Sequence, residues 1–284
     1  MPELPEIEVL VRHLRPVLQN KRISRVEVRR AKVIRPTSIR AFVNRLEGAK
    51  FAGLTRRGKY LLFELESARD RGRLPLLAHL GMTGRMYLLP RETPLPKHTS
   101  VVMHLRREMF VFEDTRYFGR MTFDLGPIDK LGPEPLDSGF TADVLLRRLR
   151  HSKQSIKIKL LDQSLIAGLG NIYASEALYR AKVAPTLRSR QITSAQTARL
   201  WRAIRQVLSE AIRFGSTVPL NYSGINSQDR LFYYGLAPGA EDFYEERLRV
   251  YDRAGQTCPS CGAIIRRMVQ AGRSTFFCPR CQHR

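Results

Sequence analysis

The chain has 284 residues, 43% of them hydrophobic, which is enough for two or three domains with real cores and excludes wholesale disorder. It contains 49 Lys and Arg against 26 Asp and Glu, and the resulting formal net charge of +23 indicates a polyanionic partner. No apolar run reaches transmembrane length and no lipidation signal is visible, so we expect no membrane partner.

The N-terminal residues are acidic at Glu3, Glu6 and Glu8, which does not suit a signal or transit peptide. We therefore expect a cytosolic protein. In that compartment the four cysteines should be reduced or bound to metal.

The first predicted element is a helix. Apolar residues recur at helical spacing from Ile7 to Leu18, so the helix should start near Pro5, a favoured first-turn position. Pro16 should kink or shorten it.

Pro2 and Glu3 precede this helix and form a chemically suggestive pair. If Met1 is removed, the chain begins with a secondary amine that is followed by a carboxylic acid. An amine nucleophile beside an acid is the minimum needed to open a sugar through a Schiff base. Pro and acidic residues also suit a helix start, and for the pair taken alone this plainer interpretation is the stronger one.

Short runs that favour β-strands follow the helix through about residue 125. The runs lie at residues 23–28, 60–63, 76–78, 101–105 and 109–112. Because only three residues separate the last two runs, we expect a hairpin there. Several short strands at this spacing predict a sandwich or barrel, not a doubly wound sheet.

The segment 125–135 is rich in Gly and Pro and marks a domain boundary. Beyond it the apolar period becomes helical, over residues 144–149 and again over 200–212. A Gly-rich and polar stretch, 215–239, then leads into a short basic C-terminal module.

The positive charge gathers in two places. Eight basic residues lie between Lys21 and Arg40 with only Glu27 against them, and six Arg without any acid follow from Arg253 to the end. A solvated basic face explains either cluster by itself. The two together indicate a shared anionic ligand more firmly.

The C-terminal module carries two C-x2-C pairs with sixteen residues between them. Four thiolates from two such turns can surround one zinc ion tetrahedrally, and the set has no open position, so a structural zinc is expected. A redox pair is possible for one C-x2-C but improbable for two at this spacing. The predicted ligands are Cys258, Cys261, Cys278 and Cys281.

Three arginines lie between the two cysteine pairs, where a hairpin would project them. We favour phosphate contact for Arg273, which lies in a Gly-containing turn. For Arg266 and Arg267, phosphate contact and a solvated turn are equally supported.

Six motifs occur in a fixed order along nearly the whole chain, each moderate evidence alone. They are PELPE at residues 2–6, RGKY at 57–60, HLGMTG at 79–84, DTRYFG at 114–119, GLGNIYASE at 168–176 and the terminal cysteine module. In this order they resemble bacterial formamidopyrimidine-DNA glycosylase, the Fpg or MutM family.

The resemblance implies an α+β fold with DNA bound between its parts. We expect an N-terminal helix and catalytic β-sandwich domain over residues 1–130. A helix-two-turns-helix DNA-binding domain should follow over 131–240, and a four-cysteine zinc ribbon over 241–284.

The resemblance also implies the chemistry. Pro2 would attack C1′ of the damaged nucleotide, and Glu3 would act as acid and base on the sugar. Lys59 would lie near the base and the departing phosphate, Glu6 would help to organise the site, and we place Arg273 in both the catalytic and the DNA-binding sets. The plainer alternatives are a basic turn residue for Lys59 and a first-turn carboxylate for Glu6.

Three residues match the family's set that fills the space left by an extruded nucleotide. Met82 and Phe118 would enter the base stack, and Arg116 would bind the orphaned base. Core packing is the alternative for Met82 and Phe118, although the glycines flanking Met82-Thr83 favour a protruding tip.

Other residues match phosphate contacts. Lys157 and Asn171 would bind phosphate, helped by backbone amides at the helix start that follows Gly168 and Gly170. Asn171 is also a plausible helix cap. His79 would face the sugar-phosphate backbone or be a satisfied histidine at a strand end.

We therefore expect a bifunctional DNA glycosylase and abasic-site lyase of base excision repair. It would excise 8-oxoguanine and formamidopyrimidines from duplex DNA through a Schiff base at Pro2 and β,δ-elimination. It should be a monomer in the bacterial cytoplasm, associated with the nucleoid through DNA.

Residues 217–246, which in the family close over the lesion, match less well and look long, so lesion preference is in doubt. The rivals are an endonuclease VIII-type enzyme acting on oxidised pyrimidines, a glycosylase that uses water in place of Pro2, and a non-catalytic zinc DNA-binding protein. The sequence leaves the lesion ranking, the preferred opposite base and regulation open.

Overall fold

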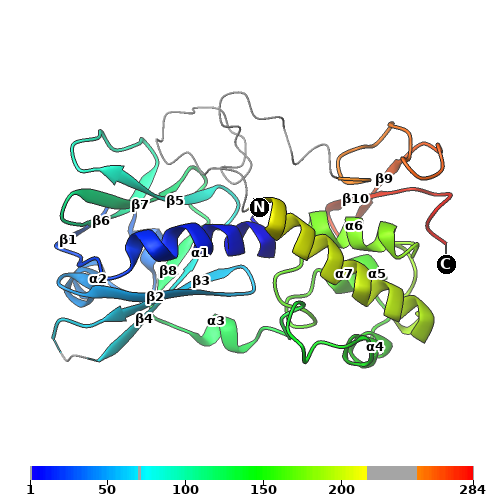
Figure 1. Cartoon of the computed structure of the whole chain (residues 1–284), viewed down its shortest axis with the longest axis horizontal. Coiled ribbons are helices and arrows are strands. Elements are labelled where there is room, and N and C mark those ends of the chain that lie inside the picture. The colour runs from blue at the N-terminus through cyan, green and yellow to red at the C-terminus, as the bar shows by residue number, and fades with distance from the viewer. Residues whose placement is uncertain (1, 70–71, 216–247, 284) are drawn as a thin grey trace. The chain divides into compact units, whose positions relative to one another are not determined.

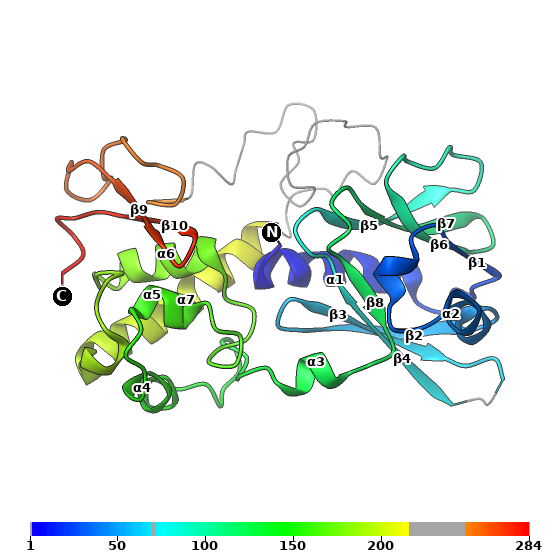
Figure 2. The same cartoon turned by 180° about the vertical axis from the view of Figure 1, so that it is seen from behind.

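The computed structural model describes residues 2–69, 72–215 and 248–283. Contacts group most of residues 6–129 into one compact unit, and residues 3–5, 130–214 and the described C-terminal part into a second. Figures 1 and 2 show the elements of each unit from opposite sides. The division into three domains stays a prediction.

The first unit is a sandwich of two four-stranded antiparallel sheets, with strand orders β1-β6-β7-β5 and β2-β3-β4-β8. This confirms the predicted β-sandwich, including the hairpin, in which β6 pairs with β7. The strands are β1 (Arg25–Val28), β2 (Lys50–Arg57), β3 (Tyr60–Glu66), β4 (Arg73–His79), β5 (Gly84–Pro90), β6 (Thr99–His104), β7 (Glu108–Asp114) and β8 (Arg120–Thr122).

Helix α1 (Leu4–Leu18) packs its apolar residues into the same core as both sheets. The expectation that Pro16 shortens this helix was wrong, because the helix continues to Leu18 with Pro16 inside its last turn. The first unit also contains η1 (Ala31–Ile34), α2 (Ile39–Leu46) and α3 (Gly126–Asp129).

Helix α2 lies where only strands were expected. Ser38 caps it, since the Ser38 hydroxyl accepts a hydrogen bond from the Ala41 N–H at 3.2 Å. Phe42 and Leu46, one turn apart, are its buried residues. The cap and this spacing are the local signals that would have found the helix.

Three phenylalanine rings join the two sheets of the sandwich. Phe51 on β2 and Phe63 on β3 come from one sheet, and Phe110 on β7 comes from the other. Their ring centroids lie 5.8 to 6.1 Å apart in edge-to-face arrangements. Such contacts stabilise a core beyond the area that they bury.

The second unit is helical and ends in an antiparallel hairpin, β9 (Arg266–Gln270) and β10 (Arg273–Phe277). Its central helix is buried at every residue from Ile172 to Tyr179. Both predicted helical stretches and the C-terminal hairpin are confirmed. The helices are α4 (Ala142–Arg150), α5 (Ile156–Leu160), α6 (Asn171–Arg180), η2 (Ser189–Gln191) and α7 (Ser194–Gly215). None of the helices in the described ranges is long and apolar enough to cross a membrane.

Truncation of Phe110 should destabilise the sandwich because it leaves a cavity among the three rings. We expect Phe110→Ala to lower the free energy of unfolding by about 3–5 kcal/mol in urea denaturation. Phe118→Ala is the matched control, since Phe118 is 48% exposed, and should change stability by less than about 0.5 kcal/mol. Equal losses in the two variants would contradict the role given to the ring cluster.

Candidate active site and metal centre

The Glu3 carboxylate sits at the N-terminus of α6. Glu3 is 2% exposed, and its two carboxylate oxygens accept the backbone N–H of Ile172 at 3.0 Å and of Tyr173 at 3.4 Å. The N-cap residue Gly170 has no side chain to supply these bonds. Glu3 therefore satisfies amides that a helix start leaves open, and the helix dipole favours its negative charge.

Two glycines make room for this contact. A Cβ on Gly170 would lie 2.2 Å from the carboxyl carbon of Glu3, and one on Gly168 would lie 2.7 Å from the Leu4 side chain. Gly168 also has φ +83°, and its carbonyl accepts the Leu4 N–H at 3.1 Å. Segment 168–170 is thus shaped to receive residues 3 and 4.

This geometry revises two expectations. The amides of Ile172 and Tyr173 hold Glu3, whereas the sequence suggested phosphate for this helix start. Asn171 does not cap α6, because Gly170 is the N-cap residue. The Asn171 amide instead accepts from the Lys157 ammonium at 2.5 Å and donates to the Ser274 carbonyl of β10 at 2.9 Å.

Lys157 is a fully buried cation beside these groups. Its pKa is lowered to about 8, mainly by burial and also by the charge of Arg273, while the charge of Glu3 opposes the shift. The ammonium is therefore still mostly protonated at neutral pH. A buried cation with a neutral amide as its partner suits an incoming anion, which would offset the cost of desolvation.

The structure thus brings four predicted residues together: Glu3, Lys157, Asn171 and the exposed Arg273 on the hairpin. Lys159, on the same short helix as Lys157, differs because it forms a partly exposed ion pair with Asp162 at 2.6 Å. The arrangement can hold an anionic group close to a fixed carboxylate.

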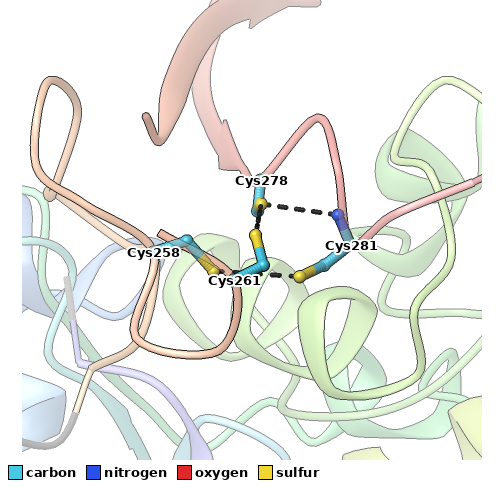
Figure 3. Close-up of side chains that lie close together, drawn as sticks. All are labelled: Cys258, Cys261, Cys278 and Cys281. Atoms are coloured by element: carbon cyan, nitrogen blue, oxygen red, sulfur yellow. Dashed lines mark hydrogen bonds between the residues drawn. The ribbon is translucent and has the colours of Figure 1, made fainter. Parts of the chain in front are cut away.

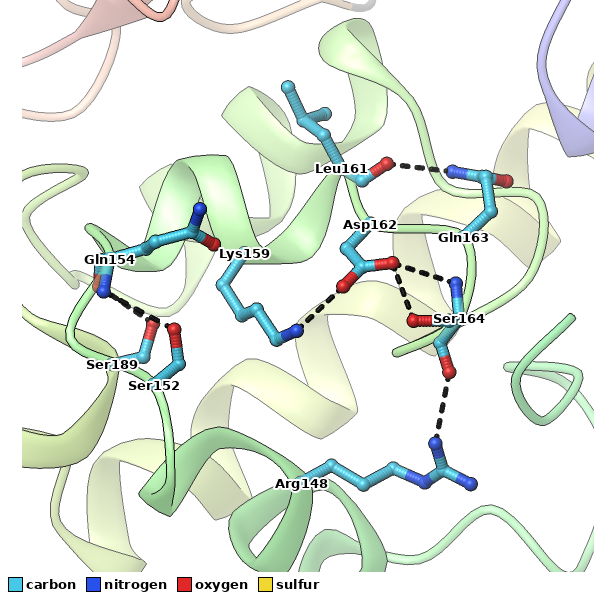
Figure 4. Close-up of polar contacts among 9 residues, drawn as sticks. All are labelled: Arg148, Ser152, Gln154, Lys159, Leu161, Asp162, Gln163, Ser164 and Ser189. Atoms are coloured by element: carbon cyan, nitrogen blue, oxygen red, sulfur yellow. Dashed lines mark hydrogen bonds and ion pairs between the residues drawn. The ribbon is translucent and has the colours of Figure 1, made fainter. Parts of the chain in front are cut away.

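The turns between α5 and α6 support this arrangement (Figure 4). Asp162 accepts bonds from the Ser164 N–H at 2.9 Å and hydroxyl at 2.6 Å as well as from Lys159. The Gln163 amide donates to the Leu161 carbonyl at 3.0 Å and to the Leu169 carbonyl at 2.8 Å. Its oxygen accepts the Gly168 N–H at 2.9 Å. These bonds fix the glycine segment that meets Glu3.

Pro2 and Glu6 stand on either side of residues 3–5 in the sequence, and both are buried. Glu6 lies in the first turn of α1 at 2% exposure, which agrees with the position expected for it. Lys59, in the β2–β3 turn, is also buried, at 6% exposure. Both interpretations of Lys59 place it in this turn, and its catalytic role stays a prediction.

His79 ends β4 and is neutral. Its Nδ1 accepts the Gly81 N–H at 3.0 Å, so the ring hydrogen is on Nε2. The pKa of His79 is lowered to about 4, mainly by burial and also by the charges of Lys59 and Arg120. His79 can therefore donate a hydrogen bond but adds no positive charge at neutral pH.

The two predicted wedge residues lie on exposed turns. Met82 is 39% exposed and Phe118 is 48% exposed, which excludes the core-packing alternative for both. The Arg116 guanidinium lies 5.0 Å from the Phe118 ring centroid. Exposed large apolar side chains are typical of interaction sites.

Asp114 joins these two turns, although the sequence alone suggested no role for it. It is fully buried and accepts the Thr83 hydroxyl at 2.6 Å, the Gly119 N–H at 2.7 Å and the Arg116 N–H at 3.2 Å. An acidic residue at the end of a largely apolar strand was the available signal. Asp114 sets the spacing of Met82 and Phe118.

The four cysteines form the expected metal site (Figure 3). The sulfurs of Cys258 and Cys281 are 3.8 Å apart, those of Cys261 and Cys278 are 3.5 Å apart, and all four lie within 4.8 Å of one another. Four sulfurs bound tetrahedrally to zinc at about 2.3 Å would be about 3.8 Å apart. The donor set therefore fits one structural zinc ion.

Helix α6 connects the metal site to the Glu3 site. The Tyr179 hydroxyl lies 3.2 Å from the Cys258 sulfur and 2.7 Å from the Ser260 hydroxyl. The buried Glu176 carboxylate accepts the backbone N–H groups of residues 249–251, each at 2.9 Å. The ribbon is thus bonded along the helix whose first residue is Asn171.

Family models match three segments of the chain. They are the formamidopyrimidine-DNA glycosylase N-terminal domain at residues 1–121, the H2TH domain of the same enzymes at 131–221, and a zinc finger found in FPG and IleRS at 255–284.

Full-length relatives and solved structures agree. Formamidopyrimidine-DNA glycosylases of Desulfitobacterium hafniense and Symbiobacterium thermophilum are 39% and 42% identical over 99% of this chain, covering 100% and 89% of their own lengths. A Lactococcus lactis Fpg (MutM) bound to DNA containing N7-benzyl-Fapy-dG has a TM-score of 0.86 at 31% identity, covering 100% of both chains. The same enzyme with abasic-site DNA has a TM-score of 0.85 at 32% identity, covering 99% of this chain and 100% of that one.

Zinc removal should unfold the hairpin and release the far end of α6. We expect one zinc per chain by atomic spectroscopy, and a lower melting temperature after chelation, because little apolar core holds this module. The affinity for duplex DNA should fall together with the melting temperature, and adding zinc should restore both quantities. An unchanged melting temperature in metal-free protein would contradict a structural role.

Gly170→Ala should displace Glu3, because its Cβ would overlap the Glu3 carboxyl group. We expect a loss of about 1–3 kcal/mol in unfolding free energy and a strong loss of turnover on damaged DNA. Gly139→Ala is the matched control, since a Cβ there meets nothing within 4 Å. If the two variants behave alike in denaturation and turnover, the close approach at Gly170 has no consequence.

Proposed function

Because this chain belongs to the formamidopyrimidine-DNA glycosylase family, we propose that it excises oxidised purines and then cleaves the abasic strand with Pro2 as its nucleophile. The chain is a DNA glycosylase of base excision repair with one structural zinc. Lyase activity, the roles of individual residues and the monomeric state are parts of the proposal.

The observation that carries the proposal is the fixed Glu3 carboxylate directly after Pro2. Once Met1 is removed, the Pro2 nitrogen would bond to C1′ while the bond from C1′ to the base breaks. Glu3, held as a carboxylate, would accept the proton that the Pro2 nitrogen loses and give it to the ring oxygen as the sugar opens. Its orientation by α6 means that the acid does not have to be positioned when the substrate arrives.

A secondary amine suits the second half of the reaction. The iminium that it forms cannot lose its charge by deprotonation at nitrogen, so it remains an electron sink. It acidifies C2′, and loss of that proton expels the 3′ phosphate; a further elimination expels the 5′ phosphate. The amine must be neutral to attack, against an ordinary α-amino pKa of about 7.7–8.

The remaining residues would hold and open the duplex. Phosphate beside Glu3 would be bound by Lys157, Asn171 and Arg273. Lys59, which belongs to the sandwich, would lie near the phosphate that departs. The neutral His79 would donate a hydrogen bond to the DNA backbone.

Met82 and Phe118 would enter the stack after the damaged nucleotide is extruded, with Arg116 on the orphaned base. The exposure of both apolar tips supports this. The segment 217–246, expected to close over the lesion, lies outside the described residues, so the preference for purines rests on the family. We place the protein in the bacterial cytoplasm.

Blocking the N-terminal amine tests the proposal. Protein that keeps an N-terminal tag should bind abasic-site DNA normally, yet it should form no covalent adduct with borohydride and should not cut the strand, because its Pro2 nitrogen is an amide. The same chain with a C-terminal tag is the control and should be trapped in full. Equal trapping of both forms would remove Pro2 from the mechanism.

A further inference from the structure

Three side-chain hydrogen bonds join helix α1, or the residue directly after it, to strand β2 in the first unit, and we call them three levels. At the end of β2 far from the β2–β3 turn, Gln19 Nε2 donates to the Ala52 carbonyl at 2.8 Å, and at the next level Arg15 Nε donates to the Leu54 carbonyl at 2.7 Å. At the third level, Arg56 Nε of β2 donates to Glu8 Oε2 of α1 at 2.9 Å. Helix α1 follows directly on Pro2 and Glu3, and the β2–β3 turn carries Lys59. The third level is the one nearest that turn.

Arg56 differs from the other two levels because it also bonds the turn itself. Its NH1 group donates to the Gly58 carbonyl at 3.0 Å while its Nε donates to Glu8. The Arg56 side chain is only 10% exposed. Burial opposes the charge of Glu8, but hydrogen bonds from Arg12 and Arg56 outweigh it and keep the pKa of Glu8 below its ordinary value. The anchor on α1 is therefore anionic.

The bonded carbonyl belongs to the peptide that leads into Lys59. Arg57 pairs with Tyr60, so Gly58 and Lys59 are the two central residues of the turn. Gly58 has φ +56°, the left-handed value that the first central residue of a tight hairpin of this kind requires. The orientation of its carbonyl fixes the peptide plane from which the Lys59 side chain departs.

We propose that Arg56 is a positioning residue that, anchored on α1 by Glu8, holds the Gly58–Lys59 peptide so that Lys59 keeps its place in the reaction. The inference rests on the function proposed above for Lys59. Lysine has a flexible four-carbon stem, so its ammonium is directed mainly by its backbone and its surroundings. A planar guanidinium holds its Nε and NH1 donors at a fixed separation, and the single ammonium nitrogen of a lysine at position 56 does not reproduce that pair.

A double-mutant cycle tests the proposal. The measured quantity is the single-turnover rate of strand cleavage on duplex DNA with an abasic site, for Arg56→Lys, Lys59→Ala and the double variant. We expect Arg56→Lys alone to lower this rate on the order of tenfold, since small misplacements of a reacting group are costly, with the Kd for DNA within about twofold of wild type. In the Lys59→Ala background the same change should have no further effect.

Arg15→Lys is the matched control, because Arg15 bonds the same strand at Leu54, one level farther from the β2–β3 turn, and this bond does not involve that turn. It should lower the melting temperature about as much as Arg56→Lys and leave the cleavage rate unchanged. If Arg56→Lys folds poorly, Glu8→Gln keeps the shape of the anchor and removes its charge. It should give a smaller rate loss, again only when Lys59 is present.

The outcomes separate the role of Arg56 from that of Lys59. Equal rate losses from Arg56→Lys with and without Lys59 would overturn the positioning role while leaving Lys59 in the mechanism. A wild-type rate for Lys59→Ala would overturn both the role proposed for Lys59 and the inference built on it.

Discussion

The interaction on which the site depends is the bond between the Glu3 carboxylate and the first amides of α6. A buried carboxylate is costly unless it is hydrogen-bonded, and here two backbone N–H groups and the helix dipole offset that cost. The contact in turn requires Gly170, because any Cβ there would overlap the carboxyl group. It also explains why residues 3–5 group with the helical unit although α1 continues into the sandwich. The acid of the proposed reaction is therefore held by secondary structure and not by loop packing.

Helix α6 is the common support for three functions. Its first residue, Asn171, orients the buried Lys157, its Glu176 carboxylate holds the chain that enters the metal module, and its Tyr179 reaches a zinc ligand. These residues span about 12 Å of helix. Because α6 is buried along nearly its whole length, it links the metal end to Asn171 as one continuous element.

Several features of the described residues are unfavourable in the free protein and, under the proposed function, would become favourable once DNA is bound. Lys157 is a buried cation bonded to a neutral amide, and Met82 and Phe118 expose apolar surface. Asp114 accepts hydrogen bonds from both exposed turns and so links them to each other. His79, by contrast, is kept neutral by burial and nearby cations, so it adds a donor without adding charge. Under the proposed function, these features suit a polyanionic ligand whose bases stack.

The sequence by itself determined what depends on local pattern: the helices with a 3.6-residue period, five of the eight strands of the sandwich, the cysteine spacing and the ordered motifs that identify the family. Each of these signals lies within a few neighbouring residues, where period, turn chemistry or ligand spacing constrains the chain directly. Only the tertiary structure decided that Glu3 occupies the amides of Ile172 and Tyr173, that Asn171 binds Lys157 instead of capping its helix, and that Asp114 and Arg56 hold their turns. Those contacts join residues as far as 170 positions apart, and no local pattern specifies which of many polar groups will meet when the chain folds.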